Sequence, residues 1–106
     1  MAKYLFRTKY TAAGLNGLLK EGGTSRREAL KQTIEGVGGS LEGFYYAFGD
    51  EDLLIIADLP DHAAATAASI NIGAAGALEV AVTVLVSPET IDQAVKKSVS
   101  YRAPGD

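Results

Sequence analysis

The chain repeats one plan twice: a strand, a helical region, and a second strand that is entered through a tight turn. In chain order, the segments of the two repeats are Lys3–Tyr10, Thr11–Val37 and Ser40–Phe48, then Asp52–Leu59, Pro60–Gly73 and Leu78–Val86. A doubled β-α-β unit within 106 residues predicts one domain. Its sheet should be four-stranded and antiparallel, with both long helices on one face.

The second repeat predicts that both faces of this sheet are covered. Leu53–Ala57 is a near-continuous apolar run, which is typical of a strand that is buried on both sides. Because the two helices can cover only one face, a second copy of the chain has to cover the other. The sequence therefore predicts a homodimer built sheet to sheet, and it leaves a larger assembly open.

Turn and capping residues predict where the helices begin and end. Thr11 offers a hydroxyl N-cap, and Gly22-Gly23 should interrupt the helix that follows, since each glycine costs about 1 kcal/mol inside a helix. Ser25–Glu28 fits a capping box, which predicts that the helix restarts there. Ser87-Pro88-Glu89 places a cap, a proline and an acid in the order that opens a short C-terminal helix.

Composition excludes several classes of protein. The net charge is −3 and the basic residues are scattered, whereas nucleic-acid-binding domains cluster them, so no nucleic-acid partner is expected. No apolar run approaches the roughly 20 residues that span a bilayer, and the N-terminus lacks a signal-peptide pattern. We therefore expect a cytoplasmic protein without a membrane partner. The absence of cysteine excludes disulfides, thiolate metal sites and a cysteine nucleophile.

Five segments resemble the GYD family, and together they extend the resemblance over essentially the whole chain. These segments are Lys3–Thr11, Gly22–Arg26, Phe44–Asp50, Asp58–Asp61 and Ser98–Arg102. The hairpin reads Phe48-Gly49-Asp50, so the Gly-Tyr-Asp signature is not literally present.

The resemblance implies a fold and a mode of assembly. The GYD family is similar to the dimeric α/β-barrel superfamily, in which two ferredoxin-like subunits pair their sheets face to face. An α+β fold is therefore implied, a ferredoxin-like β-α-β-β-α-β sandwich with a C-terminal helix. Relatives in the superfamily include cofactor-free monooxygenases, haem-degrading enzymes, muconolactone isomerases and stress-induced binding proteins. No single activity follows, because sites and not folds carry chemistry.

His62 is the first catalytic candidate. It is the only histidine, and its ordinary pKa lies near neutrality. Asp58 ends the preceding strand, so an Asp58–His62 pair could form a general base with its orienting carboxylate. The alternative is an exposed first-turn histidine, with Asp58 or Asp61 capping the helix. A haem ligand at this position would be too accessible to water, and with one histidine a metal site would need carboxylates. We therefore expect neither cofactor nor metal.

Polar side chains that interrupt the strands are candidates for ligand binding. The candidate residues are Arg7, Glu42, Tyr45 and Tyr46. By the period-two rule Glu42 and Tyr46 share one face, as do Leu54, Ile56 and Asp58. Pairing of Arg7 with Glu42 or Glu79 would make these residues structural, whereas a shared polar pocket would bind an aromatic compound or a carboxylate.

Glycines before Ser25-Arg26-Arg27 could also hold an anion at a helix N-terminus. The segment lacks P-loop spacing and does not follow a strand, so a simple helix break with a capping box is favoured.

Three functions remain open on these observations. The first is a small-molecule binding protein that holds an aromatic or carboxylate ligand. The second is a cofactor-free monooxygenase or isomerase with His62 as the base. The third is an interaction module whose purpose is the homo-oligomer itself.

Overall fold

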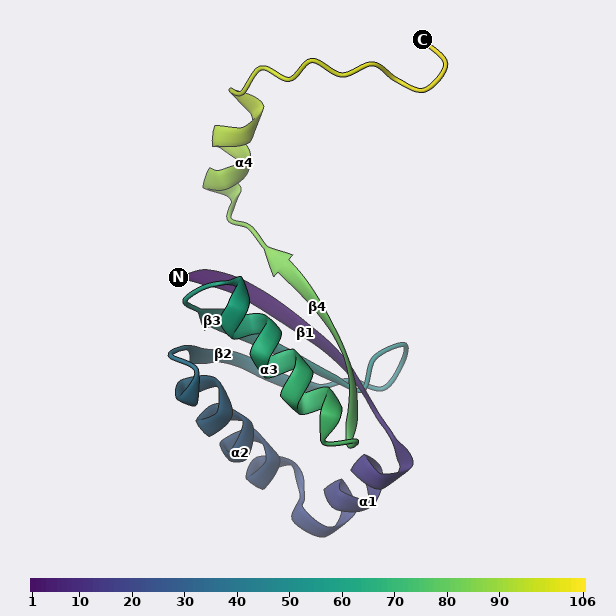
Figure 1. The fold of residues 1–106 in the computed structure, drawn as a ribbon. Coiled ribbons are helices and arrows are strands. Elements are labelled where there is room, and N and C mark those ends of the chain that lie inside the picture. The colour runs from purple at the N-terminus through teal and green to yellow at the C-terminus, as the bar shows by residue number, and fades with distance from the viewer.

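The computed structural model describes residues 1–106 and confirms the α+β fold (Figure 1). Its elements are β1 (Ala2–Tyr10), α1 (Ala12–Glu21), α2 (Gly23–Gly36), β2 (Ser40–Tyr46), β3 (Leu53–Leu59), α3 (His62–Ala74), β4 (Leu78–Leu85) and α4 (Pro88–Val95). None of these helices combines the length and the apolar character that crossing a lipid bilayer requires.

The four strands form one antiparallel sheet in the order β2-β3-β1-β4, which is the ferredoxin-like arrangement. The two inner strands, β1 and β3, each come from the start of one repeat. Phe6 of β1 pairs with Ile55 of β3 on one side and with Val82 of β4 on the other. The edge strands are β2 and β4.

The core lies between this sheet and the helices α2 and α3. Alternate residues of the inner strands point into it, because side chains along a strand alternate between its faces. The strand residues that are buried there are Tyr4, Phe6, Thr8, Leu53, Ile55, Ala57 and Leu59. Leu30 and Ile34 of α2 and Ala65 and Ala68 of α3 cover them. The one buried polar side chain, Thr8, donates its hydroxyl to the Leu53 carbonyl at 2.9 Å.

The other face of the sheet, here called the open face, has no helix over it. Its central apolar side chains are all partly exposed: Leu5, Leu54, Ile56 and Leu85. The apolar run of β3 is thus divided between the buried core and the partly exposed open face. The register of β3 confirms the prediction that Leu54, Ile56 and Asp58 share a face. Nothing within the chain covers the open face.

A β-bulge corrects one prediction about β2. Leu41 pairs with Ala57 and Gly43 pairs with Ile56, so Glu42 is the extra residue between them. A bulge shifts the alternation of side chains by one position. Tyr46 consequently lies on the helix side, where its hydroxyl donates to the Gly23 carbonyl at 3.3 Å. Glu42 instead pairs with Lys3 on the open face. The prediction that Glu42 and Tyr46 share a face is therefore wrong.

Two of the three predicted N-caps are present at the helix starts, and one is not. Thr11 caps α1 by accepting from the Gly14 amide, and Ser87 caps α4, as predicted. The capping box at Ser25 is wrong, because α2 already begins at Gly23 and has no side-chain cap. Gly22, with a φ of 77°, makes the break between α1 and α2, and a left-handed backbone of this kind favours glycine.

We expect Gly14→Ala to destabilise the fold by about 2 kcal/mol, through overpacking. A Cβ atom at Gly14 would overlap the Ala77 carbonyl oxygen and lie 2.7 Å from Cδ1 of Tyr10. The matched control is Gly17→Ala in the same helix, where a Cβ atom meets nothing within 4 Å. That change should stabilise the helix by roughly 0.5–1 kcal/mol. Urea unfolding measures both values, and equal effects would contradict the close packing of α1 on the start of β4.

We also expect stability to fall above pH 10, partly through Tyr10. Burial, and then a hydrogen bond with Tyr46, raise the pKa of Tyr10 above its ordinary value of 10.0. The folded state therefore favours the protonated phenol. Its contribution is complete below pH 10 and is lost as the pH rises toward the folded-state pKa, since the unfolded chain gives up its proton first.

In Tyr10→Phe, the free energy of unfolding should fall less between pH 10 and 12 than it does in the natural chain. Tyr101→Phe is the control, because Tyr101 is exposed in the C-terminal tail and should leave the pH dependence unchanged. Identical slopes for the two variants would refute a role for Tyr10.

Candidate functional site

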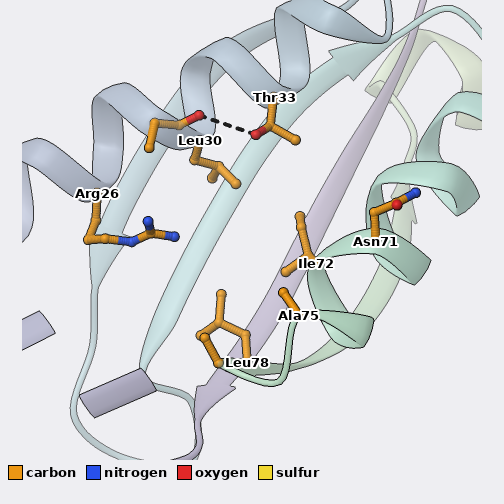
Figure 2. Close-up of a pocket in the computed structure, with 9 residues that line it drawn as sticks. Arg26, Leu30, Thr33, Asn71, Ile72, Ala75 and Leu78 are labelled. Carbon is orange, nitrogen blue, oxygen red and sulfur yellow. Dashed lines mark hydrogen bonds between the residues drawn. The ribbon is translucent and has the colours of Figure 1, made fainter. Parts of the chain in front are cut away.

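A cleft between α2 and α3, here called the inter-helix cleft, is a candidate ligand site (Figure 2). Its volume is about 260 Å³. The lining residues are Arg26, Ala29, Leu30 and Thr33 of α2, Asn71 and Ile72 of α3, and Ala75, Ala77 and Leu78 beyond it. Figure 2 shows Arg26 extending from α2 into the space that faces Ile72 and Leu78.

The spacing of residues along α2 places its four lining side chains together. Residues three, four and seven positions apart share one face of a helix, as do Arg26, Ala29, Leu30 and Thr33. The turn after α3 and the start of β4 close one end of the cleft with small residues. Leu30 and Leu78 also belong to the hydrophobic core, so the floor of the cleft is continuous with it.

Arg26 is the only charged residue that lines this cleft. The other polar side chains are already engaged by their own helices: Thr33 donates to the Ala29 carbonyl at 3.2 Å, and Asn71 donates to the Ala67 carbonyl at 2.8 Å. Arg26 has a single ion-pair partner, Glu21, with 3.5 Å between Nη1 and Oε2. A guanidinium has five N–H donors, so most of them remain available to a ligand.

The cleft therefore suits a compound with an apolar body and one anionic group. A planar guanidinium binds a carboxylate through two parallel hydrogen bonds, and the alanine, leucine and isoleucine walls accept an aromatic or aliphatic body.

The structure places the two predicted catalytic residues apart. His62 is exposed at the start of α3, and its Nδ1 shares a hydrogen bond of 2.6 Å with the hydroxyl of the buried Tyr4. Asp58 faces the other side of the sheet, where it accepts from Lys3 at 3.0 Å. The Asp58–His62 hydrogen bond of the general-base alternative is therefore not formed, because Asp58 points to the open face. Asp61 caps α3 by accepting from the Ala64 amide, as in the alternative reading.

Two of the basic residues on the open face, Lys3 and Arg7, form ion pairs. Lys3 pairs with both Glu42 and Asp58. The hydrogen bond with Glu42 is the main cause of a raised pKa for Lys3, and that with Asp58 is the next. Arg7 pairs with Glu51 at 3.5 Å, and not with Glu42 or Glu79, the two partners that the sequence suggested for a structural role. These contacts support a structural role for the charges.

The four predicted ligand-binding residues do not converge on one pocket. Arg7, Glu42 and Tyr45 lie toward the open face or the β2 edge, whereas Tyr46 lies on the helix side. Glu42 and Tyr45 do border a shallow groove of about 440 Å³ beside Arg27 and Lys31. Their role in binding stays a prediction.

Sequence reasoning found Arg26 only as part of an anion loop and missed the cleft. The available signal was the helical spacing of Arg26 with Ala29, Leu30 and Thr33. Their partners on α3 lie more than 35 positions away, and only the fold brings them together. No group of three or more histidine, cysteine and carboxylate side chains is arranged to hold a metal ion.

Comparison with known proteins agrees with the resemblance noted in the sequence. The GYD domain family matches residues 4–95. No curated protein and no solved structure matches the chain. Since the matched segment runs from β1 through α4 and includes every strand of the sheet, the chain belongs to the GYD domain family.

Proposed function

We propose that the protein binds a small amphipathic carboxylate, with an aromatic or aliphatic body, in the inter-helix cleft. The observation that carries this function is the presence of one charged group, Arg26, in an otherwise apolar cleft. The side chain of Arg26 is 35% exposed, so a carboxylate beside it would be partly shielded from water. Shielding strengthens the attraction between the two charges.

The size of the cleft limits the ligand. Drug-sized ligands occupy pockets of about 300–1,000 Å³. At about 260 Å³ the inter-helix cleft falls just below that range, which favours a compound with one or two rings or a short chain.

Titration of the natural chain with 2-naphthoate and with the neutral 2-naphthalenemethanol tests the ligand class. We expect tighter binding of naphthoate, because only the carboxylate can pair with Arg26. Arg26→Ala should weaken naphthoate binding about tenfold, since a hydrogen bond to a charged group contributes about 1.5–3 kcal/mol. Its affinity for the neutral alcohol should be unchanged. Chemical-shift changes in NMR spectra report both the affinity and the residues affected.

Arg27→Ala is the matched control for this experiment. Arg27 is the next residue of α2, but it is exposed, pairs with Glu28 at 3.7 Å and does not line the cleft. Its removal should leave both affinities unchanged. Equal losses in the two variants would point to general charge attraction and would rule out the cleft, as would equal binding of acid and alcohol.

We further propose that the open face pairs with a second copy of the chain, giving a homodimer of the sheet-to-sheet type. Leu5, Leu54, Ile56 and Leu85 give this face an apolar centre that no helix covers. The ion pairs of Lys3 and Arg7 lie along it. An apolar centre with charged residues around it is the usual anatomy of a protein interface.

Ile56→Lys should weaken self-association about tenfold or more, because it places an unpaired charge in the proposed interface. Ile70→Lys is the control, since Ile70 is 63% exposed on α3, on the opposite side of the sheet. Sedimentation equilibrium measures both association constants. A natural chain that stays monomeric, or equal effects of the two changes, would refute pairing through the open face.

A further inference from the structure

A second groove lies between α3 and the edge strand β4, here called the α3–β4 groove. Its volume is about 340 Å³, and small-molecule sites occupy about 300–1,000 Å³. One wall is a single face of α3, because its lining residues are three, four and seven positions apart. These residues are His62, Ala65, Thr66 and Ser69. Val82 and Val84 of β4 form the other wall, and Tyr4 of β1 also borders the groove.

The α3–β4 groove lies on the helix side of the sheet, opposite to the open face. Val84 pairs with Tyr4, whose side chain points into the core, so Val84 and Val82 two positions before it point to the same side. The two valines nevertheless remain 50% and 37% exposed. Alanine, threonine and serine on the facing wall are short, so they do not fill the space between α3 and β4.

The polar centre of the groove is a hydrogen bond between Tyr4 and His62. The Tyr4 hydroxyl lies 2.6 Å from Nδ1 of His62, and the two rings meet edge to face with their centroids 5.8 Å apart. Tyr4 is 1% exposed, and Nδ1 is the only hydrogen-bond partner of its hydroxyl. If the hydroxyl accepted from Nδ1, its own hydrogen would be buried without an acceptor, which is unfavourable. Tyr4 is therefore the donor.

This hydrogen bond decides which nitrogen of His62 carries the proton. A neutral imidazole has one N–H donor and one bare nitrogen that accepts. Because Nδ1 accepts from Tyr4, the proton lies on Nε2. His62 is exposed, so this N–H group is accessible to a ligand. In this tautomer His62 offers a hydrogen-bond donor, whereas the general-base alternative needs a bare Nε2.

The rest of the lining favours an uncharged ligand. No lysine, arginine, aspartate or glutamate borders the groove. A charged ligand would lose hydration there without gaining an opposite charge. Thr66 already donates its hydroxyl to the His62 carbonyl at 2.7 Å. The Nε2–H group of His62, with the Ser69 hydroxyl further along the helix, therefore suits an oxygen that accepts hydrogen bonds.

We propose that the α3–β4 groove binds a small uncharged carbonyl compound. Its oxygen accepts a hydrogen bond from Nε2 of His62, and its apolar body packs on Val82 and Val84. Tyr4 is a positioning residue, because it acts on the ligand by fixing the tautomer of His62. This site shares no residue with the inter-helix cleft, and it stays open when the open face is covered. It therefore does not depend on either function proposed above.

Nitrogen NMR of the imidazole tests the tautomer in the natural chain. At about pH 8.5, where a histidine side chain is neutral, the chemical shifts of the two ring nitrogens distinguish the protonated one from the bare one. We expect the proton on Nε2. Tyr4→Phe should raise the share of the tautomer with the proton on Nδ1. A proton on Nδ1 in the natural chain would overturn the proposal, and an unchanged tautomer in Tyr4→Phe would overturn the role of Tyr4.

Titration with acetophenone and with α-methylstyrene tests the ligand class. The two probes have the same shape, but the first carries a carbonyl oxygen where the second carries a methylene group. We expect tighter binding of acetophenone, with chemical-shift changes at the methyl groups of Val82 and Val84. His62→Phe keeps an aromatic ring and removes the N–H donor. It should weaken acetophenone binding about fivefold and leave the binding of α-methylstyrene unchanged.

Ile70→Phe is the matched control, since Ile70 is exposed on α3 and does not line the groove. It should leave both affinities unchanged. Equal binding of the two probes, or equal losses in His62→Phe and Ile70→Phe, would overturn the carbonyl site. Chemical-shift changes at Ile72 and Leu78 in place of the two valines would also overturn it, because they would put acetophenone in the inter-helix cleft.

Discussion

The sheet has two apolar faces, and the chain has helices for only one of them. The inner strands show this most clearly: Phe6 and Ile55 are almost completely buried beneath α2 and α3, whereas Leu5 and Ile56 beside them are partly exposed. Because alternate residues of a strand must point to opposite sides, the helices that bury one set leave the other set exposed. The pairing proposed for the open face would cover this second set.

The same alternation decides which polar residues can act together. Tyr4 of β1 and Asp58 of β3 point to opposite faces of the sheet. His62 at the start of α3 therefore hydrogen-bonds with the hydroxyl of Tyr4 and not with the carboxylate of Asp58. Arg7 is likewise confined to the open face, away from the inter-helix cleft. A cation for that cleft has to come from a helix, and Arg26 of α2 supplies it.

The order and faces of the inner strands could be predicted from sequence, because the pattern of β1 and β3 is regular and local. Thr11 and Ser87 were predictable as caps for the same reason. The bulge at Glu42 could not be predicted, because the composition of β2 does not indicate an extra residue. The bulge moves the side chains that follow it in β2 to the opposite face of the sheet. The capping box at Ser25 failed because the left-handed turn at Gly22 starts the helix earlier. The cleft depends on contacts between distant helices, which a local pattern cannot encode.

Within the cleft, structural and binding roles coincide at most positions. Leu30 and Leu78 form its floor and are also buried core residues, so their removal would change stability and affinity together. Arg26 is different, because its guanidinium is partly exposed and holds only one weak ion pair. It can be replaced without opening a cavity in the core. If the cleft binds a carboxylate as proposed, discrimination between an acid and its neutral analogue would depend on Arg26, and a change there would affect recognition without disturbing the packing that forms the cleft.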